Sequence, residues 1–222
     1  MNILELKLYT NCLLEQTKFY TEVLGVNLVK TTERYSVLQL GKSRLVFEQS
    51  KMSRPYHFAI NISTNKIDEA LLWLDRRVKV LKYNNNLVQD FVNWNAKAIY
   101  FYDVDHNIVE FIARGNLEFN RKGDFDADDL LEISEIGLPV EEIQPTYNSL
   151  NSIVPLKVFD GGFDRFCAIG DERGLFICIN KNKKTWFPTG DKAYSSRFEI
   201  LIKEKNQDYS LEFQKGILTS FN

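Results

Sequence analysis

The feature of this 222-residue chain that most constrains its fold is an order of elements that occurs twice. Alternating apolar and polar residues over 3–10 predict a half-buried strand. Apolar residues at helical spacing over 13–24 then predict a helix that ends at Gly25, where a left-handed residue would close it. Three short β-type stretches follow, at 27–32, 35–40 and 44–49.

The same order returns further along the chain. Residues 56–62 predict a strand, and an apolar stripe from Ile67 to Val78 predicts a helix. Three strands are expected after it, at 78–83, 97–102 and 107–114. Segments 1–49 and 55–114 therefore share one βαβββ order with a period of roughly 50 residues; propeller blades and helical arrays of that period have only strands or only helices.

The remainder of the chain predicts a connector and a third unit. We expect a connector at 115–127, and the eight acids without a base between 124 and 142 indicate a solvated segment that runs into a strand at 130–138. Pro145 and Pro155 are expected to interrupt the helix of this unit. Strong β patterns return at 165–169, 175–180 and 197–203, so 128–222 is interpreted as a divergent, helix-poor copy, with an unrelated β appendage as the alternative.

Composition excludes several classes of protein. The 28 basic and 30 acidic residues argue against a nucleic-acid partner, which requires a basic excess. Apolar runs such as 175–179 are far shorter than the ~20 residues of a membrane span, and Glu5 and Lys7 interrupt any leader-like start. The three cysteines cannot all pair within one chain and match no zinc motif, so we expect a cytoplasmic protein.

Two motifs carry a resemblance to a known family. Phe19-Tyr20 followed by Leu24-Gly25 resembles the helix ending of the first unit in the vicinal oxygen chelate superfamily, which includes glyoxalases, bleomycin-resistance proteins and extradiol dioxygenases. The sequence DVDHNIVEF at 103–111 resembles that family's ending of the second unit. The resemblance implies an α+β fold in which the units at 1–49 and 55–114 pair into a cupped mixed sheet, followed by the third unit.

The resemblance also implies a metal site, because ligands in that family come from the first and last strands of each unit. Counting from the motifs gives Glu5, His57 and Glu110 as ligands. The fourth position falls on Val46, which cannot bind a metal, and Glu48 on the same strand face is the expected substitute. Read without the resemblance, His57 is a hydrogen-bonded structural histidine and the glutamates are solvent-facing.

These residues imply a metal-dependent enzyme acting on a small carbonyl, enediolate or catechol-like substrate. One imidazole and two or three carboxylates suit Fe, Mn, Ni, Co or Zn, with Glu110 as the first candidate base and Glu5 as the second. Ring-cleaving dioxygenase chemistry is weighed lower because it uses more histidines, and His106 falls in a turn. The alternative is a metal-free small-molecule binding protein of the bleomycin-resistance kind.

An odd third unit has no partner among the first two. Its sheet edge would need cover, so either third units pair in a homodimer or the third unit packs on the first domain. Beyond a small-molecule substrate or ligand, no nucleic acid or membrane partner is expected.

Overall fold

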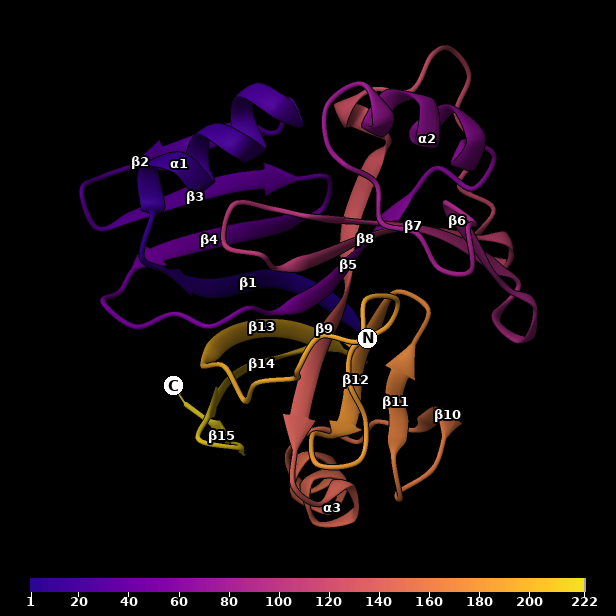
Figure 1. The fold of residues 1–222 in the computed structure, drawn as a ribbon. Helices are drawn as coiled ribbons and strands as arrows, with labels where there is room; N and C mark the ends of the chain where they lie inside the picture. The colour runs from indigo at the N-terminus through magenta and orange to yellow at the C-terminus, as the bar shows by residue number, and fades with distance from the viewer. Residues whose placement is uncertain (222) are drawn as a thin grey trace.

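Residues 1–221, which this computed structural model describes, form two mixed β-sheets with short helices packed against them (Figure 1). Sheet A has the strand order β15-β14-β13-β1-β4-β3-β2, and sheet B has the order β10-β11-β12-β9-β5-β8-β7-β6. Within the described residues, no helix is long and apolar enough to cross a membrane.

The first unit has the βαβββ order expected from the sequence. Gly25 has a φ of +67°, the left-handed conformation predicted for the residue that ends the helix. The last turn of the helix is π-helical (Phe19–Val23). The elements are β1 (Asn2–Thr10), α1 (Leu13–Lys18), β2 (Asn27–Thr31), β3 (Tyr35–Leu40) and β4 (Ser43–Gln49).

The second unit also has this order, with one strand displaced from its expected place. The strand expected at 78–83 is wrong, because Val80 and Tyr83 form only isolated bridges and the chain turns back through Asn84 and Asn85, both at positive φ. The strand forms after the turn instead. The elements are β5 (His57–Ile62), α2 (Ile67–Asp75), β6 (Val88–Phe91), β7 (Ala96–Tyr102) and β8 (Ile108–Arg114).

The third unit is more regular than the sequence suggested, because its helix is present. Pro145 lies in the first turn of α3 (Ile143–Ile153), where backbone N–H groups have no partner within the helix and proline costs little. The expectation of a helix-poor unit is therefore wrong. The remaining elements are β9 (Leu130–Val140), β10 (Val158–Gly161), β11 (Phe166–Asp171), β12 (Gly174–Asn180), β13 (Phe198–Glu204), β14 (Gln207–Gln214) and β15 (Ile217–Ser220).

The units do not pair as the resemblance implied. β1 of the first unit pairs antiparallel with β13, and β5 of the second pairs antiparallel with β9 of the third. The first and second units thus lie in different sheets, and the expected pairing of 1–49 with 55–114 is wrong (Figure 1). The third unit finds its partner within the chain, which removes the reason for expecting a homodimer.

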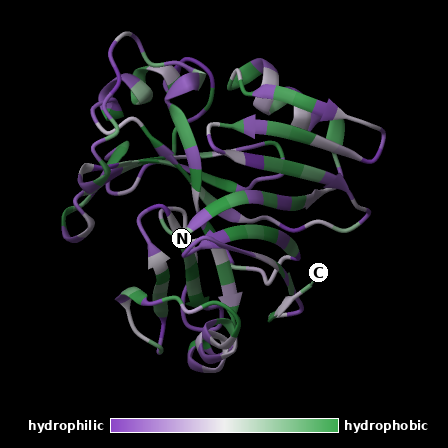
Figure 2. Cartoon of the chain, turned by 180° about the vertical axis from the view of Figure 1, so that it is seen from behind, coloured by the Kyte–Doolittle hydropathy of each residue, from purple (hydrophilic) through white to green (hydrophobic). Residues whose placement is uncertain are grey.

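The acidic segment is likewise not a solvated connector over its whole length. β9 lies in the interior of sheet B between β5 and β12, and Glu132 and Glu135 on it are buried. Apolar residues of both sheets, including Leu8, Phe58 and Ile136, form the core between the sheets. Along the strands of sheet A, hydrophobic and hydrophilic residues alternate (Figure 2). The opposite face of sheet B points away from this core and carries a separate cluster of buried residues.

Candidate metal centre

Three donor side chains meet on the face of sheet B that points away from the main core. They come from adjacent strands: Glu135 from β9, His57 from β5 and Glu110 from β8. Their ligand atoms all lie within 4.8 Å of one another, and among residues 1–221 this is the one group of its kind. We call these three residues the donor group.

The strand register explains how these residues meet. Ala59 on β5 is the Cα partner of both Glu110 on one side and Glu135 on the other. Because side chains alternate along a strand, His57 shares the face of Ala59, while Phe58 points to the core. The small methyl group of Ala59 leaves open the space between the two carboxylates.

His57 is held in the state that a metal ligand requires. Its Nδ1 atom lies 3.1 Å from the Ile108 carbonyl oxygen, so a proton on Nδ1 is donated there and Nε2 keeps a lone pair. Burial lowers the pKa of His57 to about 4, so the ring is neutral near pH 7. Nε2 lies 3.6 Å from Oε2 of Glu110. A backbone acceptor on the second ring nitrogen is the usual arrangement of a metal-binding histidine.

The two carboxyl groups differ in their neighbours. Burial, with the nearby Glu135, raises the pKa of Glu110 well above its ordinary range, although the Tyr100 hydroxyl opposes this as a hydrogen-bond donor. Burial also raises the pKa of Glu135, against the charge and hydrogen bond of Arg114. Arg114 compensates the charge of only one of the two buried carboxyl groups, so a cation would be needed to stabilise both in the charged form. The donor set therefore fits a divalent metal ion.

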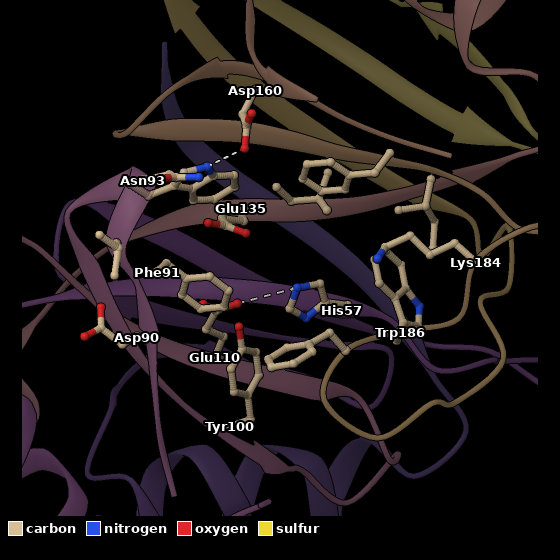
Figure 3. A pocket seen from close by; sticks show the side chains of 16 residues that line it. His57, Asp90, Phe91, Asn93, Tyr100, Glu110, Glu135, Asp160, Lys184 and Trp186 are labelled. Carbon is tan, nitrogen blue, oxygen red and sulfur yellow. Dashed lines mark hydrogen bonds and ion pairs between the residues drawn. The ribbon is translucent and has the colours of Figure 1, made fainter. Parts of the chain in front are cut away.

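The donor group lies at the floor of a cavity of about 480 Å³ (Figure 3). Ile177 of β12 lines the cavity and provides no ligand atom, so three donors from the protein leave positions for oxygen atoms of a ligand. Trp186, from the segment between β12 and β13, packs against His57 with ring centroids 4.9 Å apart. This segment lines part of the cavity, whose other walls come from the second and third units.

Two of the residues expected from the sequence are brought together, and two are not. His57 and Glu110 meet in the donor group. Glu5 lies on β1 of sheet A, 3.7 Å from the Arg44 guanidinium, and Glu48 lies on β4 of the same sheet, 3.7 Å from the Lys7 ammonium. The structure thus separates Glu5 and Glu48 from His57 and Glu110, because the first unit pairs with β13 and not with the second unit.

Glu135 was missed because of that same pairing. It lies on the first strand of the third unit, which is a ligand-bearing position in the family the chain resembles. The sequence contained a signal, since Glu135 stands between Ser134 and Ile136 in a strongly β-like segment. Interpreting the segment as solvated concealed it.

Comparison with solved structures places this architecture among known folds. A Bacillus subtilis protein provisionally named a dioxygenase matches with a TM-score of 0.64 at 15% identity, over 98% of this chain and 83% of that one. Two glyoxalase I mutants from Zea mays, E144Q and V278E, match with TM-scores of 0.54 and 0.53 at 14% and 16% identity. Each of these two matches covers 80% of this chain and 66% of the maize chain.

The resemblance to the vicinal oxygen chelate superfamily is confirmed at the level of the fold. The α+β class and the building of cupped mixed sheets from βαβββ units are as expected, whereas the pairing of the units is not. No family model and no curated protein sequence matches this chain. At such identities the likeness shows the fold alone, and the chemistry has to be argued from the donor group.

Proposed function

We propose that this protein is a metal-dependent enzyme of the glyoxalase and dioxygenase type that acts on a small oxygenated substrate. The observation that carries the proposal is the convergence of His57, Glu110 and Glu135 at the floor of a cavity. These three residues would hold a divalent ion of Mn, Fe, Co, Ni or Zn. When bound, such an ion polarises a carbonyl, enediolate or catechol oxygen and stabilises negative charge on it.

The residues around the donor group have separate tasks in this proposal. Glu110 is the candidate general base, because its carboxyl group lies in the donor group at the cavity floor, where it could take a proton from a carbon beside a carbonyl and return it. Arg114 favours the charged form of Glu135. Glu5, the second candidate base from the sequence, lies in sheet A beside Arg44 and is not part of this proposal.

The ligand set bears on which reaction is favoured. One histidine with two carboxylates differs from the two histidines and one carboxylate of ring-cleaving iron sites. His106 lies in the turn after β7, with a φ of 59°, and is not in the donor group. A proton-transfer or isomerase reaction on a carbonyl or enediolate substrate therefore ranks above ring cleavage.

One observation supports a second candidate, a metal-free binding protein. Arg114 forms an ion pair with Glu135, and the Tyr100 hydroxyl donates a hydrogen bond to Glu110, so both carboxyl groups have partners within the protein. A buried carboxyl with such partners does not require a metal. In that case the side chains that line the cavity would hold the ligand without a metal.

Metal content measured by inductively coupled plasma mass spectrometry separates the two candidates. We expect close to one metal ion per chain in tag-free protein and a loss of that metal in His57→Ala. His106→Ala is the matched control and should retain the metal, since His106 is a turn residue outside the donor group. No metal after dialysis against Mn²⁺, Ni²⁺, Zn²⁺ and anaerobic Fe²⁺ would exclude the enzyme as proposed. Bound metal would direct substrate screens to hemithioacetals, acyl-CoA epimers and catechols.

The free cysteines bear on the compartment in which the protein is found. Cys12, Cys167 and Cys178 are all free thiols, and burial raises the pKa of Cys167 to about 11. Unpaired thiols of this kind are typical of a reducing compartment. We therefore propose a cytoplasmic protein.

A further inference from the structure

The walls of the cavity indicate the class of ligand, and this inference rests on the proposed function. We propose that the ligand is a flat aromatic molecule with oxygen atoms at the donor group and an anionic group, such as a carboxylate, at the opposite end, where Lys184 binds it. Three features of the cavity support this proposal. Its walls are aromatic, Lys184 has no carboxylate partner among the described residues, and the Asp160 carboxylate already accepts hydrogen bonds from other groups.

The side walls of the cavity are mainly aromatic. Trp94 lies between β6 and β7, Trp186 lies between β12 and β13, and both line the cavity. Trp94 is fixed in place, because its Nε1 donates to Asp160 over 2.7 Å and its ring meets Phe159 edge-on with centroids 5.2 Å apart. Such rings favour a flat partner that stacks or packs edge-on. The other aromatic residues of the wall are Phe91, Tyr100, Phe166 and Phe187.

Lys184 differs from two other lysines near it in the sequence, Lys181 and Lys183. The Lys181 ammonium lies 3.3 Å from a carboxylate oxygen of Glu141, and that of Lys183 lies 2.5 Å from Asp164. Lys184 has no carboxylate partner within the described chain.

Lys184 nevertheless belongs to the cavity. Its side chain is half-buried and lines the wall, and its ammonium lies 5.8 Å from the centroid of the Phe166 ring. A partly desolvated cation without a counter-ion is unfavourable unless a ligand provides the missing charge. The position of Lys184 therefore favours an anion on the ligand.

The acids of the cavity do not neutralise Lys184. Asp160 is engaged with Trp94 and also accepts from the Gly161 N–H. Asp90 lies across the cavity from Lys184, and His57 lies between them in Figure 3. The charges are thus separated across the cavity, with the positive end at Lys184. A ligand that carries its anion at this end would leave its oxygen-bearing end for the donor group.

Calorimetric titration with three matched probes tests this inference. The probes are 6-hydroxy-2-naphthoate, neutral 2-naphthol and the (6-hydroxy-2-naphthyl)methylammonium ion. All three share the naphthalene ring and one phenolic hydroxyl group, and they differ in the second substituent, which is anionic, absent or cationic. We expect wild-type protein to bind the carboxylate about tenfold more tightly than 2-naphthol, the ratio of one charge-assisted hydrogen bond. Lys184→Ala should remove this preference, and Lys184→Arg should retain most of it.

Lys183→Ala is the matched control, because Lys183 pairs with Asp164 and does not line the cavity. It should preserve the preference for the carboxylate. Equal binding of the acid and neutral probes, tightest binding of the ammonium probe, binding of none of the three, or no effect of Lys184→Ala would each overturn the inference. Each variant is also assayed for metal. Absence of metal with a persisting carboxylate preference would reject only the enzyme, whereas bound metal without the preference would reject only the role of Lys184.

Discussion

The Nε2 atom of His57 lies 3.6 Å from Oε2 of Glu110, although the buried imidazole is neutral near pH 7 and offers no charge that would attract a carboxylate. Burial lowers the pKa of His57 to about 4 and raises that of Glu110 well above its ordinary range, so burial disfavours the charged form of each group. A lone pair and a carboxyl group thus face each other across a short gap. A metal ion between them would bind the lone pair and stabilise the charged form of the carboxyl group.

Glu135→Gln should reduce metal affinity by at least tenfold. A direct ligand contributes no less than the outer partners of ligands, whose loss costs about 10–100-fold in affinity. Glu48→Gln is the control, because Glu48 lies on sheet A beside Lys7. Competition with a chromophoric chelator measures both affinities. Equal losses in the two variants would contradict the assignment of Glu135.

Ala59→Leu should abolish metal binding without removing a ligand. Ala59 is fully buried and is the register partner of both Glu110 and Glu135, so a larger side chain would occupy the space between them. Ala98→Leu, at another fully buried alanine on β7, reports the cost of overpacking alone. Metal content of the two folded variants is the measurement, and retention of metal in Ala59→Leu would place the ion elsewhere.

Arg114→Met should destabilise the protein more without metal than with it. Arg114 is fully buried beside Glu135, and breaking a buried ion pair costs about 3–5 kcal/mol because one charge is left unpaired. A bound cation would compensate Glu135 in the variant and so reduce this loss. Urea unfolding with and without metal measures the difference.

Arg173→Met is the control for that experiment, because Arg173 is partly exposed and lies 3.8 Å from Glu132. Its effect should be under about 1 kcal/mol and independent of metal. The same loss for Arg114→Met in both conditions would argue that no cation reaches Glu135.

Gly137→Ala should displace Trp186 from the cavity. A Cβ at Gly137 would lie 2.7 Å from the Cη2 and Cζ2 atoms of Trp186, which itself packs on His57. Overpacking of this kind costs about 1–3 kcal/mol and should shift tryptophan emission as the ring becomes more exposed. Gly162→Ala is the control, since nothing lies within 4 Å of its added Cβ. Combining Gly137→Ala with Trp186→Leu should restore stability, and failure of this rescue would assign the cost to the backbone.

Asp103 should give the protein a stability that falls as the pH rises. Burial raises the pKa of Asp103 from 3.8 to about 6, even though Asn107, Tyr20 and Gln16 donate hydrogen bonds to it. Because the folded state binds the proton more tightly, this contribution is complete below about pH 4 and is lost as the pH rises through 6. A shift of about two pH units corresponds to about 3 kcal/mol.

Urea unfolding of wild type and Asp103→Asn between pH 4 and pH 8 isolates that contribution. The asparagine variant should be less stable at every pH, because its amide N–H₂ cannot accept the donated hydrogen bonds. Its stability relative to wild type should nevertheless improve as the pH rises from 4 to 7. A constant difference between the two proteins would show that Asp103 does not titrate in this range.

Local pattern was sufficient for much of the fold. Alternation along 3–10 and helical spacing along 13–24 predicted β1 and the helix that follows, because each is decided by residues a few positions apart. His57 and Glu110 could also be placed, since both belong to one unit in which first and last strands pair in parallel. The strand expected at 78–83 failed because two asparagines turned the chain before it could pair.

The sequence by itself determined that the chain consists of βαβββ units and that His57 and Glu110 face one cup. Only the tertiary structure decided which units join. β1 pairs with β13 across almost 200 residues, as Leu6 with Ile200, and β5 pairs with β9, as Ala59 with Glu135. Such pairings depend on which apolar faces bury one another over long separations, and no local pattern encodes that. For this reason Glu5 and Glu48 separate from the candidate metal centre, and Glu135 joins it.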